Sequence, residues 1–141
     1  MANAIYPKWK TALMAATANS ALNGSGSTGL FCSLIDTGVY TYSASHQFFT
    51  SLAGAIVGTD QEITSLTVGT VSDGTVDGAD ITYTGVSGAS IEAIVLYRKN
   101  AGANTTWQLV AYMDTGVTGL PVTPNGGDIT ITWNASGIFT L

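Results

Sequence analysis

The hydrophobic residues near the amino terminus recur with the period of a helix. Trp9, Leu13 and Ala16 fall at helical spacing, and residues 11–21 are mostly Ala, Leu and Met, which are good helix formers. Pro7 stands where a first helical turn tolerates its missing N–H. The pattern therefore predicts an N-terminal helix, followed by a linker across the Gly- and Ser-rich residues 23–29.

From residue 30 onward, the pattern changes to short runs rich in Ile, Val, Thr and aromatic residues, bounded by Gly, Asp or Asn. Spacings of roughly 8–15 residues between these runs favour an antiparallel β-sandwich or barrel-like fold over alternating strands and helices. A short helix is expected at residues 45–52, with Ser43 or Ser45 as its N-cap. The predicted strands are residues 30–35, 63–71, 81–84, 91–98, 107–113 and 129–133.

Two of the predicted strands, residues 91–98 and 107–113, are almost continuously apolar and are expected to be central and buried. The polar, Gly-containing loop between them predicts a hairpin. Residues 129–133 instead alternate, so Ile129 and Ile131 are expected to face the core together with Trp133, and the threonines to face solvent.

The composition restricts the function classes. Of the 141 residues, 9% are charged, where an average soluble protein has about 25%. The net charge is −5, so a nucleic-acid partner is not expected. No apolar run approaches the roughly 20 residues that span a bilayer, and no secretory leader is expected. We predict a mainly β protein with two parts: residues 1–28 as helical arm and linker, and residues 29–141 as the β domain.

Single cysteine and histidine residues limit the chemistry further. Cys32 lies in an apolar run and is expected to be a small buried residue, whereas a catalytic thiol would need His46 as its base. His46 is expected to be partly exposed in a helix or loop. Two soft ligands are too few for a structural zinc site, which takes four. No metal and no cofactor are predicted.

The sequence Asp-Thr-Gly-Val occurs twice, at residues 36–39 and 114–117. It resembles the active-site signature of aspartic proteases, in which Asp36 and Asp114 would share one proton. A two-lobed protease needs a much longer chain, and no hydrophobic-hydrophobic-Gly motif follows either copy. The simpler interpretation is a pair of strand-ending turns, with Asp accepting backbone hydrogen bonds and Gly at positive φ. We therefore predict no enzyme and keep the protease as a remote alternative.

Three further acids, Asp73, Asp77 and Asp80, are spaced loosely like calcium ligands. In an EF-hand loop that starts at Asp73, the third and twelfth positions require an acid and a Glu, but they hold Thr75 and Thr84 here. Solvated turns explain the three acids better than a calcium site.

Three long segments, residues 1–10, 34–44 and 114–133, resemble a family of small virion-associated proteins of tailed bacteriophages. The resemblance extends over nearly the whole chain and carries no catalytic residues. It implies a virion structural protein, foremost a capsid decoration (cement) protein that binds and stabilises the head lattice. The alternative role is a tail, fibre or baseplate component.

The resemblance also implies partners and a location. The partners would be the major capsid protein or other virion proteins, together with further copies of this chain, for which a trimer fits three-fold lattice positions. No membrane partner is implied. The protein would reside in the virion, on the capsid surface, after assembly in the host cytoplasm.

Tyr6, Trp9 and Leu13 are the predicted partner-binding residues of the N-terminal arm, because Trp and Tyr are enriched in binding hot spots. The alternative is that the helix folds over its own sheet and buries Trp9 there. The aromatic-rich residues 40–49 similarly suit either carbohydrate contact or the core.

Overall fold

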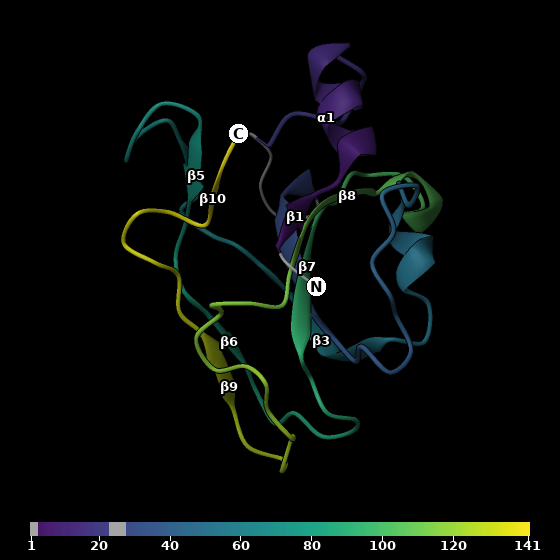
Figure 1. The fold of residues 1–141 in the computed structure, drawn as a ribbon, viewed down its shortest axis with the longest axis vertical. Helices are drawn as coiled ribbons and strands as arrows, with labels where there is room; N and C mark the ends of the chain where they lie inside the picture. Colours follow the sequence, from purple (N-terminus) through teal and green to yellow (C-terminus); the bar gives the residue numbers. More distant parts are fainter. Residues whose placement is uncertain (1–2, 23–27) are drawn as a thin grey trace.

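The computed structural model describes residues 3–22 and 28–141 and is mainly β (Figure 1). Within these residues it has three antiparallel sheets of five, three and two strands, one short N-terminal helix and no closed barrel. The predicted fold class is thus confirmed. Residues 23–27 of the predicted linker lie outside the described residues.

The elements are β1 (Ala4–Ile5), α1 (Pro7–Met14), β2 (Leu30–Ile35), η2 (Phe49–Leu52), β3 (Ile56–Glu62), β4 (Thr67–Val68), β5 (Thr75–Asp77), β6 (Ile81–Tyr83), β7 (Ala93–Arg98), η3 (Asn104–Thr106), β8 (Gln108–Met113), β9 (Ile129–Ile131) and β10 (Phe139–Thr140).

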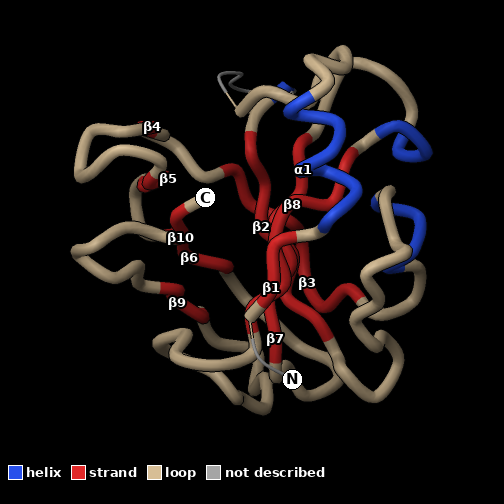
Figure 2. The backbone as a smooth tube through the Cα atoms, turned by 45° about the horizontal axis from the view of Figure 1, so that its top comes forward, coloured by secondary structure: helices blue, strands red, loops and turns tan. Residues whose placement is uncertain are grey.

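The five-stranded sheet has the strand order β1-β8-β7-β2-β3 and forms the centre of the molecule. Every residue of β7 and of β8 is buried, as their continuous apolar sequences predict. These two strands form the predicted hairpin, with Val95 opposite Tyr112. In Figure 2, the helices lie on one side of this main sheet, and the smaller sheets β10-β5-β4 and β6-β9 lie on the other.

Both faces of the main sheet are covered. On one side, the Tyr83 hydroxyl of β6 donates a 2.8 Å hydrogen bond to the carbonyl of Cys32 in β2. On the other side, the segment 36–55 crosses the sheet, and its Phe49 ring packs against Tyr97 of β7 at 4.4 Å between ring centroids. The main sheet is therefore the middle layer, and one continuous apolar core extends through it.

The N-terminal helix is shorter than predicted. It ends at Met14 instead of continuing to residue 21, and Ala16 and Asn19 adopt positive φ angles of 50° and 62°. The chain thereby turns back, so that the indole N–H of Trp9 donates a 2.8 Å hydrogen bond to the Ser20 carbonyl. If the helix continued straight, the Ser20 carbonyl would not reach the buried Trp9 indole N–H, and this N–H would be left without a hydrogen bond.

Several strands differ from the prediction. Residues 63–71 contribute only Thr67–Val68, whereas the preceding segment Ile56–Glu62 forms the unpredicted strand β3. β3 lies at the edge of the main sheet, where Asp60 and its polar neighbours are tolerated. The predicted helix at residues 45–52 is reduced to a turn followed by η2. The short strands β1, β5 and β10 were also not predicted.

The alternating strand was predicted correctly. Ile129 and Ile131 are buried in β9, and Thr130 between them is exposed. Trp133 follows the strand and is half-buried against the core.

Candidate functional site

The described part of the predicted arm packs on the protein's own sheet. β1 pairs with the edge of β8, and the backbone N–H of Tyr6 extends this pairing with a 2.9 Å bond to the Val110 carbonyl. The side chains of Tyr6 and Trp9 are both 0% exposed. The structure therefore has the alternative arrangement, in which both rings are core residues and are not available as anchors. Leu13, the third predicted anchor, is half-buried at the surface.

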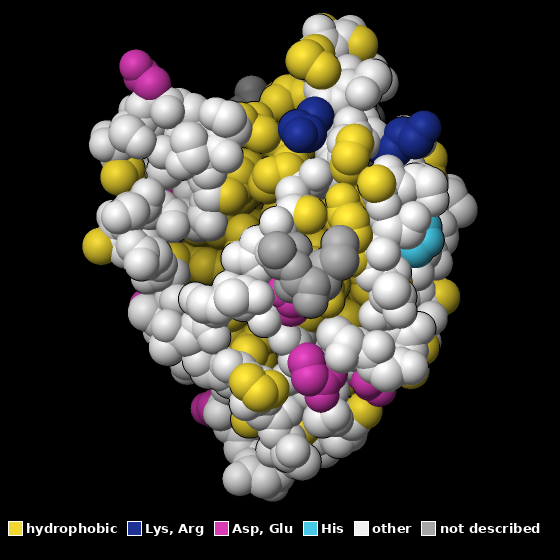
Figure 3. All heavy atoms as spheres, in the orientation of Figure 1, with side chains coloured by type: hydrophobic (Ala, Val, Ile, Leu, Met, Phe, Trp, Pro, Cys, Tyr) yellow, Lys and Arg dark blue, Asp and Glu magenta, His cyan; other side chains and the backbone are white. Residues whose placement is uncertain are grey.

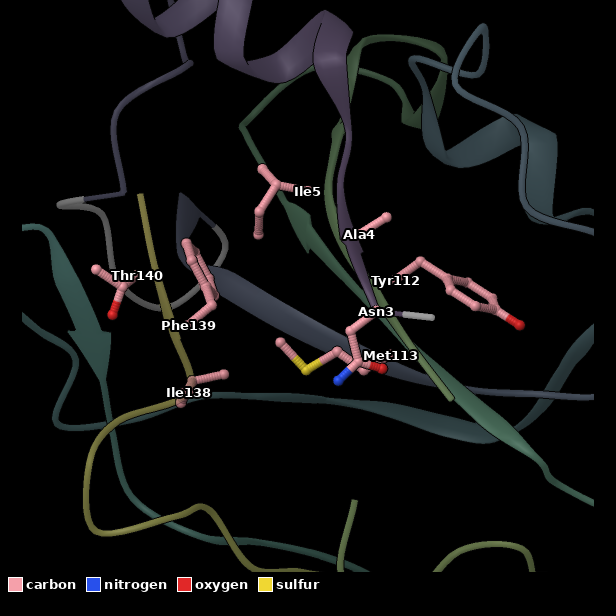
Figure 4. A pocket seen from close by; sticks show the side chains of 8 residues that line it. All are labelled: Asn3, Ala4, Ile5, Tyr112, Met113, Ile138, Phe139 and Thr140. Atoms are coloured by element: carbon pink, nitrogen blue, oxygen red, sulfur yellow. The ribbon is translucent and has the colours of Figure 1, made fainter. Parts of the chain in front are cut away.

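A groove separates β1 from β10 near the centre of the molecule. Its lower part, a hollow of about 180 Å³, has walls from β1, the end of β8 and β10. Figure 4 shows Ile5 and Met113 on one side of the hollow, Ile138 and Phe139 on the other, and the Tyr112 ring pointing away from it. The lining side chains are thus mostly apolar, although about half of the surface that they expose to the hollow is polar.

The groove continues past the helix as a second hollow of about 450 Å³, which shares Ile5 and Thr140 with the first. Here α1 contributes Leu13 and Met14 to the lining. Met14 is 81% exposed, although an apolar side chain gains free energy when it leaves water. Apolar side chains gather along this hollowed region in Figure 3, between the helix and the smaller sheets. We call the two hollows together the β1–β10 groove.

Both strands that flank the β1–β10 groove are sheet edges. In the described residues, β1 pairs only with β8, and β10 pairs only with β5. Asn3 fixes the start of β1, because its side chain accepts hydrogen bonds from the backbone N–H groups of Asp114 and Thr115 at 2.9 and 3.0 Å. The groove thus combines apolar walls with two unpaired strand edges, which is the arrangement that an added extended segment needs.

A second pocket lies on the other face of the main sheet and has a volume of about 340 Å³. We call it the tyrosine pocket. The ring centroid of Tyr42 lies 5.5 Å from that of Tyr112 and 5.1 Å from that of Tyr6. The Tyr40 hydroxyl is hydrogen-bonded to the Tyr6 hydroxyl at 2.7 Å and to His46 Nδ1 at 3.0 Å. Its lining residues are Thr37, Tyr40, Thr41, Tyr42, Glu92, Tyr112, Asp114 and Pro121.

Two carboxylates set the electrostatics of the tyrosine pocket. Glu92 Oε2 accepts hydrogen bonds from the backbone N–H and the hydroxyl of Thr37 at 3.1 and 3.0 Å. Hydrogen bonds from Ser90 and Thr37 hold the pKa of Glu92 below its usual value. Burial opposes the ionisation of Asp114, but hydrogen bonds and a nearby positive charge lower its pKa overall. Burial and the nearby Asp114 charge raise the pKa of Tyr112 to about 12. Both carboxylates are therefore ionised at neutral pH.

The repeated Asp-Thr-Gly segments form strand-ending turns. Asp36 follows β2 and accepts a 2.7 Å hydrogen bond from the Gly38 N–H, and Gly116 in the second copy has a φ of 70°. Asp114 lines the tyrosine pocket, whereas Asp36 does not.

The remaining candidate residues take structural positions. Cys32 is fully buried and His46 is half-buried in a loop, as predicted. Asp80 Oδ1 accepts a 2.9 Å hydrogen bond from the Trp133 backbone N–H. Among the described residues, no group of three or more His, Cys, Asp or Glu side chains is placed to hold a metal ion. In the same residues, no helix has the length and apolar character to cross a membrane.

The sequence matches no family model and no curated protein. Sequence reasoning missed Met14 and Phe139 in the groove and Glu92 in the pocket, because segments far apart in the chain form both sites. The aromatic residues 40–49 were the one signal that pointed to the tyrosine pocket.

Proposed function

We propose that the protein is a bacteriophage virion structural protein and acts as a capsid decoration protein on the head lattice. The observation that carries the proposal is the exposed β1–β10 groove, where Met14 and Leu141 are 81% and 54% exposed. Exposed apolar surface beside a hollow is typical of interaction sites. The resemblance of residues 1–10, 34–44 and 114–133 to virion proteins of tailed bacteriophages supports the same role.

The occupant of the groove would be an extended apolar segment of the major capsid protein. Such a segment can add to the β1 edge through backbone hydrogen bonds while its side chains cover Ile5, Leu13 and Phe139. Binding to the assembled lattice alone stabilises that lattice by mass action. The low content of charged residues suits this role, because little charge must be desolvated on contact.

Introducing a charge into the groove tests the proposal. Met14→Glu places a carboxylate in a hollow whose other lining side chains are mostly apolar, with Lys10 one helical turn away. It is expected to weaken binding to purified heads that lack the protein by about tenfold or more, since a docked segment would strip the charge of its hydration even with a cation nearby. The measurement is co-sedimentation of the purified protein with the heads.

Val68→Glu is the matched control, because Val68 is 59% exposed and lies in β4, outside the groove lining. The control is expected to bind like the wild type. Equal binding of all three proteins would contradict docking through the groove. Binding of the wild type to tails but not to heads would support the alternative role as a tail, fibre or baseplate component.

A further inference from the structure

We propose that the tyrosine pocket binds an alkylammonium group, as carried by a lysine side chain or an amino sugar. This site lies outside the β1–β10 groove and does not depend on the proposed docking there. It is a separate recognition function, and its ligand class follows from the shape, the aromatic lining and the charge of the pocket.

The pocket is assembled from four separated parts of the chain and is already formed without a ligand. Thr37 holds Glu92 through two hydrogen bonds, and Tyr6 and His46 hold the Tyr40 hydroxyl. Side chains that are fixed before binding lose little conformational entropy when a ligand arrives. At about 340 Å³, the pocket has room for a small amine with its first carbon atoms.

The aromatic lining favours a cation. Tyr42 is half-buried, and its ring meets that of Tyr112 at 46° with 5.5 Å between centroids, so the two rings form an angled wall and not a flat stack. A cation within about 6 Å of a tyrosine ring centre is attracted by the negative face of the ring. Tyr112 is 3% exposed, so Tyr42 offers most of the ring surface that a cation can reach.

The charge of the pocket selects the same ligand class. Two lining residues, Glu92 and Asp114, are acidic, and no Lys or Arg is among the lining residues. On the face shown in Figure 3, the basic side chains lie at the upper end and most acidic side chains in the lower half. An ammonium group has three N–H donors, which match the carboxylates and the hydroxyl groups of the lining threonines and tyrosines. Anionic ligands would be repelled, and neutral sugars would gain nothing from the charges.

The test is a titration of the full-length protein, followed by backbone amide NMR shifts. Two amines are used as probes: Nα-acetyl-lysine-N-methylamide and glucosamine. Their neutral counterparts are Nα-acetyl-norleucine-N-methylamide and glucose. Saturable shifts localised to residues 37–42 and 112–114 are expected with at least one amine, and weaker binding at higher salt. A response to the lysine compound alone would identify a protein side chain as the ligand, and a response to glucosamine alone would identify a saccharide.

The variants separate the pocket from a general effect of net charge. Glu92→Gln keeps an acceptor for Thr37 but removes the charge, and is expected to weaken amine binding about tenfold or more, as loss of a charge-assisted hydrogen bond implies. Asp73→Asn removes the same charge at an exposed position outside the pocket and is expected to bind like the wild type. Tyr42→Leu tests the aromatic contribution in a second way and is expected to weaken binding as well.

Three results would overturn the proposal. They are an absence of saturable shifts with both amines at millimolar concentration, equal shifts with the neutral counterparts, and unchanged amine binding in correctly folded Glu92→Gln and Tyr42→Leu. None of these results bears on head binding by the Met14→Glu variant, so failure here is distinguishable from failure of the docking proposal.

Discussion

Burial decides the chemistry of the one thiol in the protein. Cys32 is 0% exposed in the inner strand β2, between the two covered faces of the main sheet. Loss of hydration destabilises a thiolate more than a thiol, and this raises the pKa of Cys32 to about 12. Cys32 therefore acts as a small apolar core residue and not as a nucleophile.

This burial predicts that the native protein resists alkylation. At pH 8, iodoacetamide is expected to modify Cys32 at least about 100-fold more slowly than a free cysteine peptide. The reason is that the thiol of Cys32 is hardly ionised at this pH and the reagent cannot reach it. Mass spectrometry of timed samples measures the rate, and the urea-unfolded chain is the control that must react quickly. Rapid labelling of the folded protein would place Cys32 in an accessible site.

Asp60 is a partly buried residue whose charge opposes folding. Burial raises its pKa, although a 2.8 Å hydrogen bond from the Tyr97 hydroxyl partly compensates. A carboxyl group whose pKa is higher in the folded state than in the unfolded state stabilises the folded protein at low pH relative to high pH. This stabilisation is complete below the unfolded pKa and is lost as the pH rises through the folded pKa. Ionised Asp60 therefore destabilises the protein at neutral pH.

The Asp60→Asn variant is therefore expected to be more stable than the wild type at pH 7, because the amide oxygen still accepts from Tyr97 but carries no charge. The difference in the free energy of unfolding should shrink as the pH falls below the unfolded pKa of a carboxyl group, near 4. Urea titrations at pH 3.5 and pH 7 measure both values. Lower stability of the variant at pH 7 would contradict this account of Asp60.

At the scale of elements, the β7–β8 hairpin depends on the side chains that close its loop. Trp107 stands directly before β8, and its ring stacks on that of Tyr97 at 5.7 Å with an angle of 11° between planes. Its indole N–H donates to the carbonyls of Asn100 and Gly102 at 3.1 and 2.9 Å. Lys99 lies over the same ring at 4.9 Å. The loop is thus pinned to the sheet by one aromatic residue.

Truncating that residue should destabilise the protein strongly. Trp107→Ala is expected to cost about 3 kcal/mol, toward the lower end for large aromatic residues because Trp107 is half-buried. Trp107→Phe keeps the stacking but loses the indole N–H and is expected to cost roughly half as much. Thermal and urea unfolding measure both costs. A cost below about 1 kcal/mol for Trp107→Ala would mean that the ring contributes little packing.

The strands that could be predicted are those whose hydrophobic pattern matches their burial in the sheet. β2 matches its predicted residues, and β7 and β8 differ by one or two residues at their starts, because continuous apolar runs belong to central strands. β3 has a polar sequence because it lies at an edge, so its residues did not resemble a strand. The predicted end of the helix was wrong because the hydrogen bond from the Trp9 indole to the Ser20 carbonyl outweighs the helix propensity of residues 15–21.

At the scale of the whole molecule, the N-terminal segment packs into the core of the β structure. Tyr6 and Trp9 are fully buried, and the Trp9 ring meets Phe139 from β10 at 6.1 Å and 90°. The segment therefore bridges the main sheet and the three-stranded sheet. Arg98 supports it, because its side chain donates to the Ala21 carbonyl at 2.5 Å.

Deletion of residues 1–22 is consequently expected to abolish cooperative unfolding, since it removes an edge strand and two large core side chains. Circular dichroism and fluorescence during urea unfolding measure this. Met14→Glu in the full-length chain is the control and is expected to unfold cooperatively, because Met14 is exposed. A truncated chain that still unfolds in a single sharp transition would restore the separate-arm interpretation.

The two surface sites show why function was harder to predict than the fold. The β1–β10 groove joins residues from both ends of the chain, with Ile5 on one wall and Phe139 on the other, and no local sequence pattern reports such a juxtaposition. The tyrosine pocket draws Tyr42, Glu92 and Asp114 together from three segments. Only the gathering of aromatic residues at 40–49 was visible in the sequence, and that pattern fits a core equally well.

The most direct test of the proposed function is a cryo-electron microscopy reconstruction of purified virions that contain this chain. We expect density for the protein at regular positions on the head lattice, with the β1–β10 groove, including Met14, facing a segment of the major capsid protein. Absence of the protein from the particle, or attachment through another surface with the groove open to solvent, would contradict it.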